Sequence, residues 1–310
     1  AGEIAGVYVE TFEPIAGPSP GNERRVLINL HGGAFEVGAR TEGRLESIPV
    51  AHVAGMRSFV YYGALLMDRI KTAENTAERE RCQGLLDLLT PVIKAYCSDR
   101  GFEVCSQAVQ VYGGYGYTRE YPVEQLMRDV RITSIYEGTN GIQALDLLGR
   151  KLGLQKGRVF MSFMEEVGVI VARARGIEGL EALAGRVAEA VDQLGATALE
   201  LGQAAMSDRY RAAFAQATPF LEVMGDVIMA WMLLWRAVAA QPGIEKHLGR
   251  GKDKDRARAC ASRKAAFYTG QVDTARYFIN TILPVTAGKM AAIRRLDDAV
   301  VAMSETGFGG

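Results

Sequence analysis

The sequence predicts a mainly α-helical protein, in which a helical bundle is followed by a second helical domain and preceded by a short β-containing segment. Two observations lead to this fold class. Residues before about position 50 alternate or cluster their apolar side chains as strands do, whereas later apolar residues recur every three or four positions, as on one face of a helix. The chain has 310 residues, of which 48% are hydrophobic, enough for two or three units with cores of their own.

The expected β structure is confined to the start of the chain. Two valines alternate within GVYVETFEP (6–14), and the apolar run of RRVLINLHGG (24–33) ends in Gly-Gly, as a buried strand does. The stretch between them, PIAGPSPGN (14–22), is rich in turn-forming residues. Two strands are too few for an independent sheet, so we expect an incomplete segment over residues 1–52.

Residues 53–153 are expected to form the helical bundle. Apolar side chains recur at helical spacings over residues 53–70 and again over residues 85–96. Thr90-Pro91 either starts a helix, as N-cap and first residue, or kinks one. Gly113-Gly114 is expected to end this helix. The predicted elements that follow are a loop (115–122), a short helix (123–131) and a further helix (141–152).

Residues 154–310 are expected to form the second helical domain. Three stripes of apolar residues at helical spacing predict core-facing helices rather than a ligand site. Trp231 and Trp235 lie four residues apart, so they should share a helix face that packs on neighbouring helices. The stripes are Phe163, Val167, Ile170 and Ala174; Val187, Val191, Leu194 and Ala198; and Tyr268, Val272, Ala275, Ile279 and Ile282.

Charge and composition narrow the class of partner. The formal net charge is zero, with 36 basic and 36 acidic residues, which argues against nucleic acid as a partner. The longest apolar run, Val227–Trp235, is too short to span a bilayer, so no membrane insertion is expected.

Four cysteines without CxxC spacing, and a start unlike a signal peptide, indicate free thiols in a cytoplasmic protein. Three histidines far apart in sequence suggest no metal site.

The stretch TSIYEGTNG carries the most suggestive chemistry. A carboxylate is an effective base toward carbon when apolar surroundings raise its pKa toward the working pH, and Ile135 and Tyr136 precede Glu137. Gly138 would let a substrate approach the backbone, and Thr139 is suited to cap the next helix, whose amide groups would then face the site. The loop suits proton abstraction beside a carbonyl. The alternative is a helix-entry loop with a solvated glutamate.

Three longer motifs resemble the C-terminal helical domain of acyl-CoA dehydrogenases. QVYGGYGYTREYPVEQ begins at Gln110, and MRDVRI and IYEGTNGIQ follow it in the order and spacing of that family. The similarity runs from about Met56 to Lys151. FYTGQVDTARYFINTILPVTAGKMAAI (267–293) resembles the extra helical domain of longer bacterial members, which extends the similarity toward residue 310. The predicted bundle is therefore expected to be of the acyl-CoA dehydrogenase type.

This resemblance implies an FAD-dependent enzyme that dehydrogenates an acyl-CoA thioester between its α and β carbons. Glu137 matches the base that removes the α-proton while a β-hydride passes to FAD, and Gly138 matches a backbone contact to the thioester. An electron-transfer flavoprotein or similar acceptor is implied as partner. A homo-oligomer is also implied, in which the segment that begins at Gln110 meets the FAD of a neighbouring subunit. The residues matching FAD contacts are Gln110, Val111, Tyr112, Gly113 and Gly114, and then Thr139, Asn140 and Gly141.

Two departures leave other functions open. The N-terminal and middle domains of acyl-CoA dehydrogenases have no counterpart in this sequence, which predicts impaired activity, since stabilising a transition state needs the whole site. LINLHGGAF (27–35) instead resembles the oxyanion segment of hormone-sensitive-lipase-type α/β-hydrolase esterases, around Gly32 and Gly33. No serine lies in G-x-S-x-G to act as its nucleophile. The alternatives are thus such an esterase or a non-catalytic helical assembly module.

Overall fold

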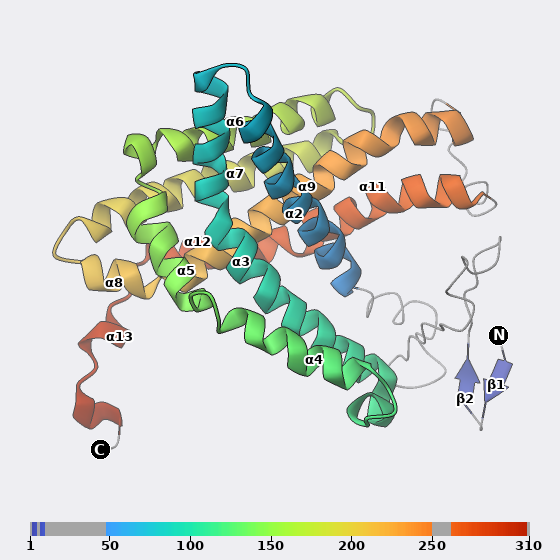
Figure 1. The fold of residues 1–310 in the computed structure, drawn as a ribbon, viewed down its shortest axis with the longest axis horizontal. Helices are drawn as coiled ribbons and strands as arrows, with labels where there is room; N and C mark the ends of the chain where they lie inside the picture. The colour runs from blue at the N-terminus through green and yellow to red at the C-terminus, as the bar shows by residue number, and fades with distance from the viewer. Residues whose placement is uncertain (1, 5–6, 10–47, 250–261, 309–310) are drawn as a thin grey trace.

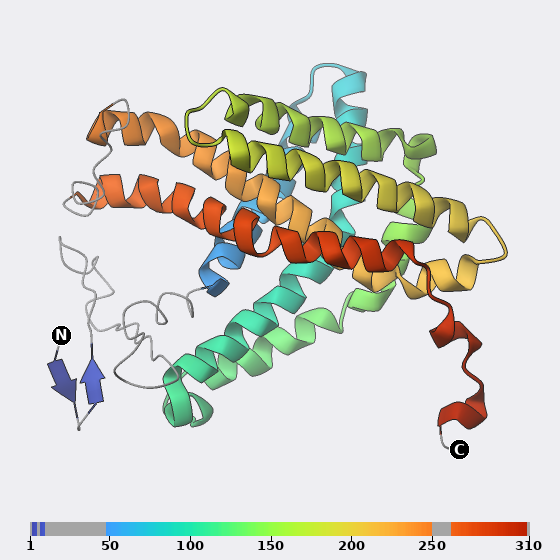
Figure 2. The ribbon, with the colours of Figure 1, turned by 180° about the vertical axis from the view of Figure 1, so that it is seen from behind.

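The computed structural model describes residues 2–4, 7–9, 48–249 and 262–308. Helices predominate among these residues, which confirms the mainly α-helical prediction. Figures 1 and 2 show the helical body from opposite sides, with one long helix, α9, running through its middle. The chain therefore builds its core by helix-on-helix packing.

The β structure among the described residues is a small antiparallel hairpin. β1 (Gly2–Ile4) pairs with β2 (Val7–Val9), with Gly2 opposite Val9. The alternating valines thus form a strand, which confirms the short β-containing start. The strand predicted over 24–33, and the HGG motif within it, lie outside the described residues. The esterase alternative consequently receives no support from the described part of the chain.

The first two helices form an antiparallel pair (Figure 1). α2 spans Ile48–Thr72 and α3 spans Thr76–Tyr112. The Asn75 side chain caps α3 by accepting a hydrogen bond from the Glu78 backbone N at 2.7 Å. Because α2 already begins at Ile48, it crosses the boundary expected between residues 52 and 53. The domain boundaries as such stay predictions.

Helix α3 continues through Pro91, where the sequence predicted either the start of a helix or a kink. Thr90 Oγ1 donates to Leu86 O at 2.7 Å, an intrahelical bond, so Thr90 caps no new helix and the N-cap reading is wrong. Pro91 lacks an N–H, and its ring crowds the carbonyl four residues before it. Figure 1 shows α3 changing direction near its middle, which agrees with the kink alternative.

The segments after α3 follow the sequence prediction closely. Gly113, at φ +60°, ends α3 and its N–H bonds to Gln110 O. α4 spans Val123–Arg131 as predicted. The helix expected over 141–152 is split into α5 and a π-helical turn. The remaining elements are η1 (Gly113–Tyr117), η2 (Ile132–Ser134), α5 (Asn140–Asp146), η3 (Leu147–Lys151), η4 (Leu154–Gly157), α6 (Arg158–Arg175), α7 (Glu181–Ala205), α8 (Tyr210–Ala215), α9 (Ala217–Leu248), α11 (Arg263–Thr281), α12 (Leu283–Arg294), α13 (Ala299–Ala302) and η5 (Glu305–Phe308).

Helix α9 is the centre of the core. Every residue from Val223 to Leu234 is buried, and α2, α3, α6, α7, α11 and α12 all contact this helix. A helix that is apolar on all sides needs such a surround. Among the described residues α9 alone is long and apolar enough to cross a membrane, and 83% of its most apolar window is buried inside the protein. That burial is what a core helix requires.

The predicted apolar stripes face this core. The stripes on α6 and α7 are buried, and Ala275 and Ile279 of the third stripe are buried on α11, with its other members partly covered. Trp231 is fully buried and its ring stacks at 6.0 Å from that of Trp235, so the shared face is confirmed. One continuous core therefore joins α2 and α3 to the later helices.

Candidate active site

The loop that carries Glu137 connects two short helical segments. η2 ends at Ser134, and α5 begins at Asn140 with Thr139 as its N-cap, whose Oγ1 accepts from Ile142 N at 3.4 Å. The predicted cap is thus confirmed. Between them Glu137 has φ +56°, a left-handed conformation that is uncommon for a residue with a side chain. The loop therefore holds a strained backbone at the position of the expected base.

Gly138 has a conformation that this loop requires. Its φ is +85°, and a Cβ at this position would lie 2.9 Å from Gln143 Nε2. The same Nε2 donates to Glu137 O at 3.4 Å. Any larger residue would meet both a backbone penalty and a crowded neighbour. The glycine thus lets the chain turn sharply directly after Glu137.

A polar clamp on α3 holds the segment after Glu137. Lys94 Nζ donates to Gly138 O at 2.7 Å and to Asn140 Oδ1 at 2.8 Å. Asn140 Nδ2 in turn lies 2.8 Å from Ser98 Oγ and 2.7 Å from Asp99 Oδ1. These four contacts tie residues 138 and 140 to α3.

Lys94 brings positive charge close to the expected base. Its pKa is lowered, chiefly because burial penalises the ammonium, while the carboxylates of Asp99 and Glu137 act in the opposite direction. The Glu137 carboxylate is thus one of the two negative charges that act on Lys94.

The described residues do not give Glu137 the apolar surroundings that were expected. Glu137 is exposed, and Ile135 and Tyr136 expose 51% and 50% of their surface. The prediction that these neighbours bury the carboxylate is therefore wrong for the described residues. The physical reason is that both side chains project from a surface loop, whose burial depends on what packs over it and not on its own sequence.

The first segment predicted to contact FAD, residues 110–114, lies at the far end of α3. Gln110–Tyr112 form its last turn and Gly113 follows with positive φ, while Gly114 has open space where a Cβ would be. The tip is closed by Gly116, where a Cβ would overlap Val109 O, and by Tyr112 and Tyr121, whose rings lie 5.7 Å apart. The two adjacent glycines leave accessible backbone that could contact a phosphate group.

A single chain does not bring together the two segments that are predicted to contact FAD, residues 110–114 and 139–141. Asn140 is bonded to Asp99 of α3, whereas residues 110–112 form the last turn of the same helix. At a rise of about 1.5 Å per residue, Asp99 and Tyr112 lie about 20 Å apart along α3. Both ribbon views show the α3–α4 tip well away from α5. The side chains of Thr139 and Asn140 are already engaged in cap and clamp, which leaves their backbone and Gly141 for a cofactor.

Sequence reasoning missed the clamp. Lys94 and Ser98 lie four residues apart and form a polar stripe on α3 beside the buried residues Val92, Ala95 and Tyr96. That stripe was a signal, since polar side chains partly buried on a core helix need partners. Nothing local indicated that the partner was the loop more than forty residues later. Among the described residues, no group of three or more His, Cys, Asp or Glu could hold a metal ion.

Comparison with known proteins matches both halves of the helical body. Residues 51–152 match the family described as acyl-CoA dehydrogenase, C-terminal domain, and residues 163–304 match acetyl-CoA dehydrogenase C-terminal like. The 3-methylmercaptopropionyl-CoA dehydrogenase of Ruegeria pomeroyi is 33% identical over 227 residues, covering 73% of this chain and 36% of that protein. A broad-specificity linear acyl-CoA dehydrogenase of Mycobacterium tuberculosis is 25% identical over 265 residues, covering 83% and 41%.

A solved structure shares the fold. Caenorhabditis elegans ACDH-11, in complex with C11-CoA, aligns with a TM-score of 0.56 and 19% identity over 74% of this chain and 34% of that chain. At this identity the likeness concerns the arrangement of helices alone. The chain spans 36% and 41% of the length of the two relatives above.

Proposed function

Because the chain belongs to the acyl-CoA dehydrogenase family, we propose that it supplies Glu137 as the base in α,β-dehydrogenation of an acyl-CoA thioester. The observation that best supports this is the clamped loop, in which Glu137 has a left-handed backbone and the next residues are tied to α3. Such strain persists only where the surrounding structure enforces it, and it is frequent at functional sites. The backbone beside Glu137 is thereby held in place, while the residue itself is exposed and open to a substrate.

The proposed chemistry begins with a proton transfer. Glu137 takes a proton from the carbon beside the thioester carbonyl, and that electron pair forms the new double bond of a trans-2-enoyl-CoA. FAD, when bound, supplies the acceptor for the hydride that leaves the β-carbon. Gly138 allows the thioester to approach the backbone, and Lys94 holds the loop through its bonds to Gly138 O and Asn140 Oδ1.

The exposure of Glu137 sets a condition on this proposal. A glutamate acts efficiently on a carbon acid when water is excluded and its charged form is less stabilised by solvent. We infer that a second copy of the chain, the bound ligands, or both cover Ile135 and Tyr136 during the reaction. A homo-oligomer also accounts for the two separated FAD segments, because Gln110–Gly114 of one copy can then serve the site of another.

The proposed partners follow from the same reaction. The substrate is an acyl-CoA, and the acceptor of the electrons is an electron-transfer flavoprotein or a similar carrier. Gln110, Gly113 and Gly114 contact FAD through exposed backbone, and Thr139–Gly141 contact it at the start of α5. These assignments rest on the matching motifs together with the accessibility of both glycines.

The test compares two glutamates that differ in position. The purified chain is mixed with FAD and octanoyl-CoA or butyryl-CoA, and flavin absorbance and enoyl-CoA formation are measured. Glu137→Gln should lower turnover by about 10²- to 10⁴-fold while flavin absorbance is retained. Glu178→Gln, which changes an exposed glutamate between α6 and α7, should have no effect.

Two results would count against the proposal. Turnover of Glu137→Gln equal to that of the unmodified chain removes the base from this position. A chain that neither retains flavin nor produces enoyl-CoA favours the helical assembly module instead.

A further inference from the structure

The segment of α3 that holds the Glu137 loop is also bonded, on its opposite face, to helix α9. Lys94 and Ser98 lie on one face and hold Gly138 and Asn140. Tyr96 and Arg100 lie on nearly the opposite face, since successive helical residues are rotated by about 100°. The Tyr96–Arg100 face points toward α9. One short piece of α3 therefore connects the loop to the central helix.

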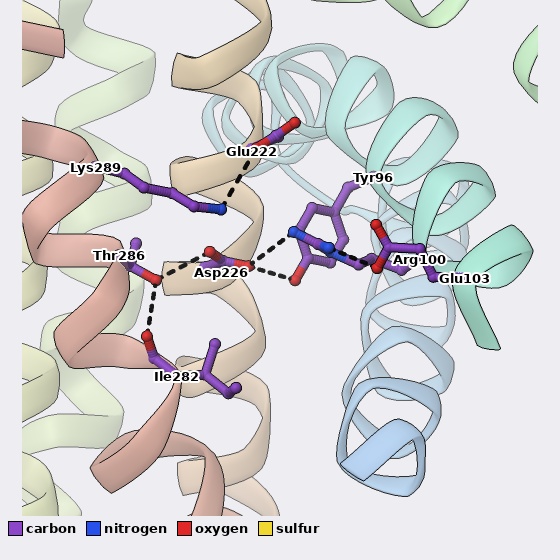
Figure 3. Close-up of polar contacts among 8 residues, drawn as sticks. All are labelled: Tyr96, Arg100, Glu103, Glu222, Asp226, Ile282, Thr286 and Lys289. Atoms are coloured by element: carbon purple, nitrogen blue, oxygen red, sulfur yellow. Dashed lines mark hydrogen bonds and ion pairs between the residues drawn. The ribbon is translucent and has the colours of Figure 1, made fainter. Parts of the chain in front are cut away.

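Asp226 of α9 is the partner on that second face (Figure 3). Its Oδ1 accepts a hydrogen bond from Tyr96 Oη at 2.7 Å, and its Oδ2 accepts one from Thr286 Oγ1 of α12 at 2.9 Å. Arg100 approaches Oδ1 to 3.8 Å and also stacks its guanidinium 5.2 Å above the Tyr96 ring. The carboxylate thus joins α3, α9 and α12.

This carboxylate is costly unless its partners stay in place. Asp226 exposes 2% of its surface and sits in α9, the most apolar of the long helices among the described residues. Burying a charge is unfavourable unless hydrogen bonds and a counter-charge compensate, so the arrangement tolerates little movement of α3. An apolar side chain would fill the same space without imposing a direction on Tyr96.

Gly225, the residue before Asp226, lets the Tyr96 ring pack directly against α9. A Cβ on Gly225 would overlap the Tyr96 ring, lying 2.6 Å from its Cε2. The ring therefore rests directly on the backbone of α9, and its hydroxyl reaches the next residue along the helix. Gly225 and Asp226 together form a notch on α9, which fixes how closely the Tyr96 ring approaches this helix and where its hydroxyl points.

We propose that the notch on α9 positions the Glu137 loop, with Tyr96 and the clamp on α3 transmitting its position. The C-terminal helices thus act on the active-site loop and do more than complete the core. Asp226 is a positioning residue and touches no substrate. The functional consequence rests on the proposed role of Glu137, whereas the mechanical link between notch and loop does not.

The chain offers a matched pair of variants for the test. Tyr96→Phe removes a buried hydroxyl bonded to Asp226, while Tyr62→Phe removes a buried hydroxyl with no hydrogen-bond partner among the described residues. Hydrogen–deuterium exchange is followed in peptides covering 132–146, and in α6 as a reference. Tyr96→Phe should speed exchange in 132–146 by about tenfold, with α6 unchanged. Tyr62→Phe should leave both segments unchanged.

A second variant tests the same link if Tyr96→Phe fails to fold. Thr286→Val removes the bond to Asp226 from α12, far along the chain from the loop, and should speed exchange in 132–146 by about threefold. Equal exchange in Tyr96→Phe and Tyr62→Phe would overturn the proposal. An increase spread evenly over all helices would overturn it too, since that indicates a general loss of stability.

A kinetic readout separates this inference from the proposed function. With octanoyl-CoA as probe, Tyr96→Phe should lower kcat and leave KM nearly unchanged, because the base is misplaced while binding surfaces remain. If the loop loosens but Glu137→Gln retains turnover, the proposed function fails and the positioning link stands. If Glu137→Gln is inactive and the loop is unaffected by Tyr96→Phe, the reverse holds.

Discussion

The core around α9 and the loop around Glu137 differ in how completely one chain builds them. Around α9, residues 223–234 are buried, and the Asp226 carboxylate has donors from two other helices. In the loop, Ile135 and Tyr136 are half exposed, although the backbone beneath them is firmly clamped. One chain therefore completes the core and fixes the backbone of the Glu137 loop, but leaves the side chains of Ile135 and Tyr136 half exposed.

The largest effect on the scaffold should come from filling the notch. Gly225→Ala places a methyl group inside the Tyr96 ring, which has no room to retreat between α3 and α9, so unfolding free energy should fall by about 3 kcal/mol. Gly202→Ala on α7 is the matched control, with open space around its Cβ, and should be neutral or stabilising by up to about 1 kcal/mol. Denaturant unfolding of both variants measures the difference; equal stabilities would contradict the packing described here.

Alkaline pH should weaken the core selectively. Burial raises the pKa of Tyr62 and Tyr96 above the ordinary value of 10.0, and nearby carboxylates act in the same direction. Above about pH 10 the unfolded chain releases these protons and the folded chain keeps them, so stability falls as pH rises, by about 1.4 kcal/mol per pH unit for each tyrosine. Below that pH the contribution is fully present.

Unfolding measured at several alkaline pH values checks this dependence. Tyr62→Phe and Tyr96→Phe should each flatten the fall in stability. Tyr117→Phe, at a residue 85% exposed, should leave the slope as it is. A slope that is the same in all three variants would show that these buried phenols do not control alkaline unfolding.

The clamp should matter for activity more than for stability. Lys94→Met removes the bonds to Gly138 O and Asn140 Oδ1, so turnover of octanoyl-CoA should fall by about tenfold while unfolding free energy changes by under about 1 kcal/mol. Lys71→Met, at an exposed lysine near the end of α2, should change neither. A Lys94→Met protein that is fully active would show that the loop holds its position without the clamp.

The smallest effect concerns two buried threonines. Thr286 donates to Asp226, whereas Thr197 donates only to Gln193 O within its own helix. Thr286→Val leaves a buried carboxylate short of a donor, so it should cost about 1 kcal/mol more than Thr197→Val in denaturant unfolding. Equal costs would mean that Asp226 gains little from α12.

Much of the scaffold could be predicted from the sequence, because its signals are local or periodic. Val123–Arg131 forms α4 as expected, Gly113 ends α3, and the stripe from Phe163 to Ala174 is buried. Pro91 allowed two readings, and the tertiary packing of α3 selects the continuous, bent helix. Asp226 inside an apolar run was a visible anomaly, since a charge there needs buried partners.

For the candidate site, the sequence suggested residues and not their environment. The resemblance proposed Glu137 and its neighbours, which stay a prediction, and the cap at Thr139 followed from residue type and is confirmed. The exposure of Ile135 and Tyr136 could not be inferred, because it depends on surfaces that come from outside the loop. The link from Lys94 to Gly138 spans distant parts of the chain and has no local signature.

If Glu137 removes a proton from the α-carbon of an acyl-CoA, that proton should also exchange with the solvent. The most direct measurement is the exchange of the α-protons of octanoyl-CoA for deuterium, followed by mass spectrometry in D2O with FAD present. We predict deuterium uptake with the unmodified chain and none above background with Glu137→Gln. Equal uptake with both proteins would contradict the account.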